Sequence, residues 1–189
     1  CDMHPYITES DDVKYAGLIT SAYAIDTILS CVLVFHRNHQ YIYWRKITMN
    51  KNDKNMHMLI LDIDHFKHIN DNYGHEAGDH ILQRCANLLS SIAGDNNIFR
   101  IGGEEFCVLV ESASNKEAIA LAESIRAQIA SAIFVVQDKS IDIEVGITVS
   151  IGISHYRQGM DLSHLLREAD LCLYQAKGNG RDQVVYPLL

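Results

Sequence analysis

The chain has 189 residues, of which 48% are hydrophobic and 21% are charged, values that are ordinary for a folded soluble domain. The length suits one domain of average size with an extension. The net charge of −8 argues against a general binder of nucleic acid or of anionic membranes. Five cysteines are scattered without metal-type spacing, and three lie within apolar patterns, so we expect reduced, buried thiols in a cytoplasmic protein.

Residues 1–50 form an N-terminal extension for which a linker, a helix, and a sensor or membrane remnant all stay open. Residues 16–35 are mostly apolar, but Asp26 lies in their middle and would cost on the order of a few kcal/mol in a bilayer. A buried or dimer-forming helix is therefore favoured there over a transmembrane segment. No secretion signal is recognisable. A polar loop at residues 50–55 marks the start of a second unit, residues 51–189.

A near-continuous apolar run at residues 56–61 predicts a strand that is buried on both faces. It leads directly into Asp62. Acids at the carboxyl end of a buried strand, before a helix, lie where open α/β sheets bind ligands. The alternative for Asp62 is a helix N-cap, whereas Asp64 is better explained as a structural residue.

Downstream, apolar residues recur at helical spacing over residues 74–92. Gly102 and Gly103 then separate two short apolar runs and predict a tight hairpin turn with φ > 0. Glu104 and Glu105 follow at once. Neighbouring carboxylates repel, so their presence at a hairpin tip favours a divalent cation, with a solvated turn as the alternative.

The remaining elements are a helix at residues 115–132, a strand at residues 141–153 that pairs with residues 134–137, and a closing helix at residues 162–177. Gly178 and Gly180 end that last helix. This order of strands and helices predicts a mixed α/β fold, with helices packed on a central sheet.

Several segments together resemble the GGDEF-domain diguanylate cyclases. They are residues 62–79 (DIDHFKHINDNYGHEAGD), 102–106 (GGEEF), 148–153 (TVSIGI) and 169–181, in the family's own order. The resemblance implies a palm-like, mostly antiparallel sheet flanked by helices. It also implies condensation of two GTP molecules into cyclic di-GMP with release of pyrophosphate.

Further expectations follow from the resemblance. Two Mg²⁺ or Mn²⁺ ions would occupy each active site, held by Asp62, the carbonyl group of Ile63, Glu104 and, more weakly, Glu105. Glu104 would also help to deprotonate the attacking hydroxyl. Because each domain holds one GTP, turnover would require a homodimer. The domain would be cytoplasmic, with attachment to the inner membrane open through residues 1–50 or an upstream domain.

The resemblance also assigns residues to the nucleotide. Asn70 and Asp79 match the guanine readers, and a carboxylate can accept two hydrogen bonds from the donor edge of guanine, which adenine lacks. His75 would border the ribose or base. The phosphates would meet backbone N–H groups near His65 and Phe66, at a helix start, and three basic side chains. Those basic residues are Lys67, Lys177 and Arg181.

Without the family, most of these residues have simpler explanations. Asn70 would be a helix-end or turn residue, Asp79 a solvated helix position and His75 a structural hydrogen-bonding group, while basic residues at a helix end complement its dipole. Two family features are missing. Residues 1–50 lack the family's opening segment, and Ala93 and Asn96 replace the arginine and aspartate of the inhibitory product site. We therefore expect no tight product inhibition there.

Two other readings of the chain remain. A catalytically silent domain would bind GTP or cyclic di-GMP, or would serve only as a dimerisation element. A cyclase using ATP or mixed nucleotides is disfavoured by Asp79. No nucleic-acid partner is expected.

Overall fold

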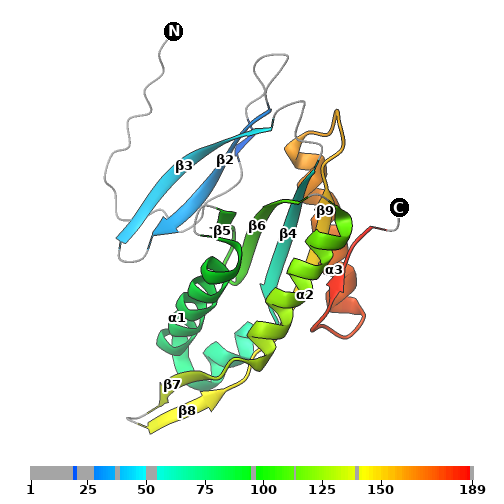
Figure 1. Ribbon diagram of the computed structural model, residues 1–189. Helices are drawn as coiled ribbons and strands as arrows, with labels where there is room; N and C mark the ends of the chain where they lie inside the picture. Colours follow the sequence, from blue (N-terminus) through cyan, green and yellow to red (C-terminus); the bar gives the residue numbers. More distant parts are fainter. Residues whose placement is uncertain are drawn as a thin grey trace.

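The computed structural model describes residues 19–20, 28–36, 39–49, 55–94, 97–112, 114–138 and 141–187. Its core is a five-stranded sheet with helices on both faces (Figure 1). The elements, in chain order, are β1 (Ile19–Thr20), β2 (Ile28–His36), β3 (His39–Met49), β4 (Met56–Ile63), α1 (Phe66–Ala93), β5 (Ile98–Arg100), β6 (Glu105–Glu111), α2 (Asn115–Ser131), β7 (Phe134–Asp138), β8 (Ile141–Val145), β9 (Val149–His155), α3 (Leu162–Gly178) and β10 (Val184–Val185).

The strands of the central sheet lie in the order β10-β9-β4-β6-β5. Every neighbouring pair is antiparallel except β10 and β9, which are parallel. The predicted fold class, a mostly antiparallel sheet flanked by helices, is confirmed. β4 is the middle strand, and all eight of its residues are buried. This burial on both faces explains why its sequence is apolar without alternation.

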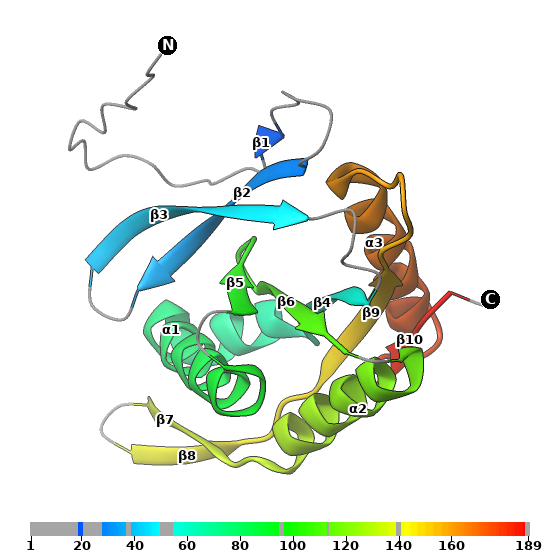
Figure 2. The same ribbon diagram turned by 45° about the horizontal axis from the view of Figure 1, so that its top comes forward.

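The two faces of the sheet are covered by different helices. Figure 2 shows α1 and α2 on one side and α3 on the other. Leu59, Leu61 and Ile63 pack in the larger core with α1 and α2, whereas Met58 and Ile60 pack with α3. Successive side chains of a strand alternate between faces, so Asp62 belongs to the α3 side. This alternation determines which helix supplies the residues that meet Asp62.

α3 approaches the sheet closely at Gly152 of β9. A Cβ atom at this position would collide with the carbonyl oxygen of Ala169 and the backbone nitrogen of Leu173 in the helix. Only glycine therefore permits this spacing between α3 and the sheet. This contact sets the distance between α3 and the sheet at Gly152.

The helix predicted at residues 74–92 begins earlier than expected. α1 starts at Phe66 and contains a kink at Gly74, where φ is 85° and ψ is 165°. Glycine tolerates this conformation because it has no Cβ atom. The sequence predicts a helix start at His65 and Phe66 and a separate helical pattern at residues 74–92, and the structure joins the two in one element with the kink between them.

The strand predicted at residues 141–153 is in fact two strands, which corrects the expectation. β8 pairs with β7 in a separate two-stranded sheet, and β9 lies beside β4 in the central sheet. Residues 146–148 interrupt the run of β-branched residues. The predicted pairing of residues 134–137 with this region is confirmed. Propensity alone identifies both strands but not the break between them, because both halves are rich in β-branched residues.

The N-terminal extension also differs from expectation. A helix was favoured for residues 16–35, but the described parts of this run are strands, and β1, β2 and β3 form an antiparallel sheet. Residues 16–18 and 21–27 lie outside the described residues. β2 and β3 are rich in β-branched and aromatic residues, which favour strands over helices. In the described part of the chain, no helix has the length and apolar character needed to cross a membrane.

Candidate active site

The pairing of β4 with β6 brings the two acidic segments together. Asp62 and Glu105 are directly opposite each other in this antiparallel register. The backbone N–H of Ile63 donates a hydrogen bond to the carbonyl oxygen of Glu104 at 3.3 Å. Asp62 is only 6% exposed, and Glu104 and Glu105 are half-buried. Acids from two separate chain segments therefore converge at one end of the central strands, as the sequence interpretation required.

The hairpin tip has a different backbone from the one predicted. Neither Gly102 nor Gly103 has φ in the left-handed region. Instead, a Cβ atom on Gly102 would collide with a carboxylate oxygen of Glu105, so the glycine makes room for that side chain. The Arg100 guanidinium donates to the carbonyl oxygen of Gly103 at 2.6 and 3.1 Å and to that of Gly102 at 3.2 Å. The tip is thus a loop held by a half-buried arginine, to which the sequence analysis assigns no role.

Lys177, near the end of α3, meets Asp62 at the centre of the site. Its Nζ lies 2.7 Å from Oδ2 of Asp62. Burial raises the pKa of Asp62, the hydrogen bond and charge of Lys177 oppose that rise, and the charge of Arg181 opposes it more weakly. A carboxylate that is buried this deeply needs a cation beside it, and the lysine provides one.

The other two acids are also in an environment that disfavours their charge. Burial raises the pKa of Glu104 most, and the negative charge of Asp62 raises it further. The pKa of Glu105 is raised by the same two causes, with a smaller contribution from Asp170 on α3. Such gathering of negative charge is characteristic of sites that bind cations or move protons.

The donor set suits a hard divalent cation that shares its ligands with a nucleotide. Among the described residues, no three side chains of His, Cys, Asp or Glu gather closely enough to hold a metal ion by themselves. Mg²⁺, however, is commonly bound by one or two carboxylates, water and the phosphates of a substrate. Asp62 and Glu104 offer carboxylates of this kind, so the residues fit Mg²⁺ or Mn²⁺ in the company of a triphosphate.

α1 begins at Phe66, four residues after Asp62 in the chain. His65 is the N-cap of the helix in a left-handed conformation with φ of 59°, and its side chain makes no capping hydrogen bond. Asp62 is therefore not the N-cap, which removes its simplest structural explanation. The first N–H groups of a helix lack intrahelical partners and attract anions. Phe66 is the first residue of α1, and Lys67 beside it is exposed.

The kink at Gly74 divides α1 into two segments, and each carries one of the predicted guanine-binding residues. Asn70 precedes the kink and Asp79 follows it. A Cβ atom on Gly78 would collide with the side-chain oxygen of Asn70, which shows that the two segments touch there. Gly78 was not singled out from the sequence, because only this contact reveals its role. His75 is exposed next to the kink.

Arg100 of the hairpin is influenced by the charge of Asp79, which lies in α1 after the kink. Burial lowers the pKa of the Arg100 guanidinium, and the charge of Asp79 opposes that change. The arginine therefore lies within electrostatic reach of Asp79 while it holds the carbonyl groups of the hairpin tip. The signal in the sequence is an arginine two residues before the glycine pair, to which the sequence analysis assigns no role.

Comparison with known proteins agrees with this geometry. The family described as "Diguanylate cyclase, GGDEF domain" matches residues 40–183, and the match begins within the segment assigned to the extension. The chain is 41% identical over 135 residues to the probable diguanylate cyclase DgcF of Escherichia coli O157:H7. This alignment covers 70% of the chain and 29% of the relative. The chain spans less than half the length of the first curated relatives.

Solved structures show the same fold. The GGDEF domain of DgcB from Caulobacter crescentus, solved in complex with c-di-GMP, is 30% identical with a TM-score of 0.64, and the match covers 69% of this chain and 77% of that one. The active GGEEF domain of a diguanylate cyclase from Vibrio cholerae is 34% identical with a TM-score of 0.60, covering 71% and 83%. The sequence, the fold and the convergent acids agree: this chain belongs to the GGDEF-domain family of diguanylate cyclases.

Proposed function

We propose that the chain condenses two molecules of GTP into cyclic di-GMP across a homodimer. The observation that carries this proposal is the convergence of Asp62 and the Glu104–Glu105 pair beside Lys177, at the end of the central strands. A buried acid, two half-buried acids, a lysine in the last turn of α3 and the start of α1 are the groups that a bound nucleoside triphosphate and its cation require.

The chemistry assigns a distinct task to each group. In each half-reaction the 3′-oxygen of one GTP attacks the α-phosphorus of the other, the bond to the β-phosphate breaks, and pyrophosphate leaves. Glu104 takes the proton of the 3′-hydroxyl, and burial together with the charge of Asp62 raises its pKa, which makes its carboxylate a stronger base. A divalent cation bound by Asp62, the carbonyl group of Ile63, Glu104 and, more weakly, Glu105 would acidify that hydroxyl and offset the charge of the leaving group.

The triphosphate is held by the start of α1 and the end of α3. Backbone N–H groups near His65 and Phe66 face the phosphates, and Lys67, Lys177 and Arg181 add positive charge. Lys177 leaves Asp62 when nucleotide and cation bind, because the cation then compensates the carboxylate. Asn70 and Asp79 bind the guanine edge, and His75 borders the ribose or base.

The need for a dimer follows from the number of GTP molecules that one domain can hold. One domain offers one set of these groups and therefore holds one GTP, so a second copy must face it in antiparallel orientation. The specific rate should rise steeply with protein concentration in the range where dimers form. A specific rate that stays constant across dilutions of a monomeric preparation would contradict this part of the proposal.

The rival function is a silent domain that binds GTP or cyclic di-GMP without turnover. Purified protein is incubated with GTP and Mg²⁺, and the products are separated and identified. Wild type and Glu111→Ala, a control at the exposed far end of β6, should both form cyclic di-GMP, whereas Glu104→Ala should form none. Nucleotide binding without product in the wild type would favour the silent domain.

A further inference from the structure

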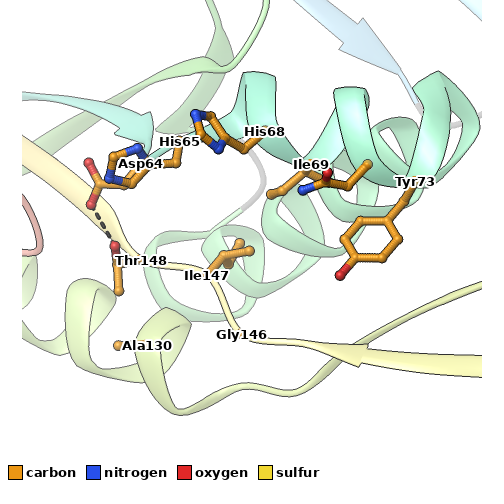
Figure 3. A pocket seen from close by; sticks show the side chains of 10 residues that line it. Asp64, His65, His68, Ile69, Tyr73, Ala130, Gly146, Ile147 and Thr148 are labelled. Atoms are coloured by element: carbon orange, nitrogen blue, oxygen red, sulfur yellow. Dashed lines mark hydrogen bonds between the residues drawn. The ribbon is translucent and has the colours of Figure 1, made fainter.

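Asp64 is a buried carboxylate that joins three separate parts of the chain. It is 5% exposed. Its Oδ2 accepts hydrogen bonds from Oγ1 of Thr148 at 2.7 Å and from the backbone N–H of Asp182 at 3.1 Å, while Oδ1 accepts one from Oγ of Ser150 at 2.7 Å. Figure 3 shows the bond to Thr148. The end of β4, the start of β9 and the loop after α3 therefore meet at one side chain.

The loop after α3 has a backbone that needs such support. Arg181 has φ of 66° and Asp182 has φ of 43°, two consecutive left-handed residues that are not glycine. This conformation is disfavoured for residues with a Cβ atom and persists where surrounding contacts enforce it. The N–H of Arg181 donates to the carbonyl oxygen of Ala176 at 3.0 Å. The N–H of Asp182, the next along the chain, is held by Asp64.

This loop carries one of the basic residues of the proposed phosphate site. Lys177 lies just before the loop and contacts Asp62, and the charge of Arg181 also reaches Asp62, two residues before Asp64. On its other side, the loop is attached to α2, because Nη1 of Arg126 lies 2.7 Å from Oδ1 of Asp182. The path of the backbone between these anchors sets the direction of the Arg181 side chain.

A pocket of about 320 Å³ borders Asp64 on another side, between α1 and residues 146–148 (Figure 3). His68, Tyr73 and Ile147 are among its lining residues. The two oxygens of Asp64 already accept three hydrogen bonds from the protein, so the carboxylate has little capacity left for a ligand there. Asp64 is thus better explained by the loop that it holds than by the pocket.

We infer that Asp64 is a positioning residue that fixes the loop after α3 and thereby aims Arg181 at the triphosphate. The inference rests on the proposed function, since it concerns the same nucleotide. Asp64 does not contact the reacting atoms in this arrangement. It acts through the N–H of Asp182, so its effect on nucleotide affinity requires Arg181.

The amide variant separates positioning from binding of a cation. In Asp64→Asn, the amide oxygen can take the place of Oδ2 and accept from Thr148 and Asp182, while the amide nitrogen donates to the hydroxyl oxygen of Ser150. The hydrogen bonds that hold the loop are therefore retained, and the negative charge of the carboxylate is lost. Asp64→Ala removes all three hydrogen bonds. A positioning role predicts that asparagine largely restores nucleotide binding, whereas a ligand for the metal ion would be lost in both variants.

The test is a double-mutant cycle that uses binding instead of turnover. The probe is the GTP analogue with a methylene group between the α- and β-phosphates, titrated calorimetrically with Mg²⁺. Arg181→Ala and Asp64→Ala should each raise Kd about tenfold, and the double variant should bind no more weakly than either one. Asp64→Asn should stay within about threefold of the wild type. Ser154→Ala is the control, because the Ser154 hydroxyl is buried in β9 without a hydrogen-bond partner among the described residues.

The possible results distinguish a failure of the inference about Asp64 from a failure of the proposed function. Absence of binding by the wild type would overturn the proposed function itself. If the wild type binds the analogue, any of three results would overturn the role of Asp64. The effects of the two substitutions could be additive in the double variant, Arg181→Ala could leave Kd unchanged, or Asp64→Asn could fail to restore binding. Should Asp64→Ala fail to fold, Thr148→Val and Thr148→Ser replace it. Valine should then weaken binding and serine should not, and equal affinities for these two variants would overturn the inference.

Discussion

The ammonium group of Lys177 lies 2.7 Å from Oδ2 of the buried Asp62 and occupies the position of a counter-ion for that carboxylate. The lysine is partly exposed, at 33%, whereas the Asp62 side chain is 8% exposed. A mobile cation on a long, partly exposed stem can leave such a partner when a stronger cation arrives. We therefore expect the pair to separate when a nucleotide and its cation bind.

Removal of this ammonium should have opposite effects on metal and nucleotide. In Lys177→Met, Asp62 loses its counter-ion, so Mn²⁺ alone should bind several-fold more tightly, whereas the GTP analogue should bind about tenfold more weakly. The metal-free variant should lose about 1–3 kcal/mol of unfolding free energy. Titration calorimetry and urea unfolding would measure these changes, with Lys116→Met, an exposed lysine on α2, as control. Weaker binding of Mn²⁺ would contradict the counter-ion role.

Neutralising Glu104 should abolish catalysis and relieve repulsion. Glu104→Gln should lower kcat at least about 100-fold, because a base and a ligand are both lost. Its Tm without metal should rise slightly, by roughly 1–2 °C, since the acid repels Asp62 and is partly shielded by solvent. Glu111→Gln, at the opposite end of β6, should change neither value. Retained kcat in Glu104→Gln would refute the assignment of the base.

The acidic cluster predicts a distinctive dependence on pH. The pKa values of Asp62, Glu104 and Glu105 are all raised, first by burial. Their contribution to stability is therefore present in full below the unfolded-state pKa values and is lost as pH rises through the folded-state values. Without metal, each of the three should favour the fold more at mildly acidic pH than at neutral pH.

Mg²⁺ should reverse this trend. Cation binding requires the ionised carboxylates, so binding releases protons and weakens as pH falls. The rate should decline on the acid side at a pH above the ordinary range of carboxylates. Tm measured against pH, with Mg²⁺ and with EDTA, would test both statements. A Mg²⁺ affinity that does not change with pH would count against the cluster as the metal site.

Gly78 should influence the choice of nucleotide although it contacts no substrate. A methyl group at Gly78 would displace the Asn70 amide, and it would lie 3.0 Å from Cζ of Phe66. Gly78→Ala should therefore raise KM for GTP about tenfold and reduce the preference for GTP over ATP, while the helix persists. Gly146→Ala is the matched control, because nothing lies within 4 Å of its added Cβ atom. An unchanged KM would argue against the placement of Asn70.

The product should not bind tightly outside the active site. Ala93 ends α1, and Asn96 lies outside the described residues; neither side chain offers the charges of the family's inhibitory site. Calorimetric titration of cyclic di-GMP, with the active site saturated by the GTP analogue, should give no low-micromolar binding. Such binding would show that another inhibitory site exists.

Elements with a local pattern could be predicted from the amino-acid sequence. The apolar run before Asp62 predicts a strand buried on both faces, and β4 is such a strand. Helix propensity and apolar periodicity predict the helices at residues 115–132 and 162–177. The glycine pair and the strand-forming residues around it predict the hairpin with adjacent acids. The family match rests on the same local segments. The roles of individual site residues, and the domain boundary near residue 51, stay predictions.

Contacts between residues that are distant in the chain became visible in the folded structure alone. The register of β4 against β6 places Asp62 opposite Glu105, and the close approach of α3 at Gly152 carries Lys177 to Asp62. Three other features also depend on tertiary packing. They are the hydrogen bond from Asp182 to Asp64, the contact of Gly78 with Asn70, and the break between β8 and β9. The physical reason is that local periodicity encodes which face of an element is apolar, whereas register, helix spacing and loop anchors depend on packing between residues that are far apart in the chain.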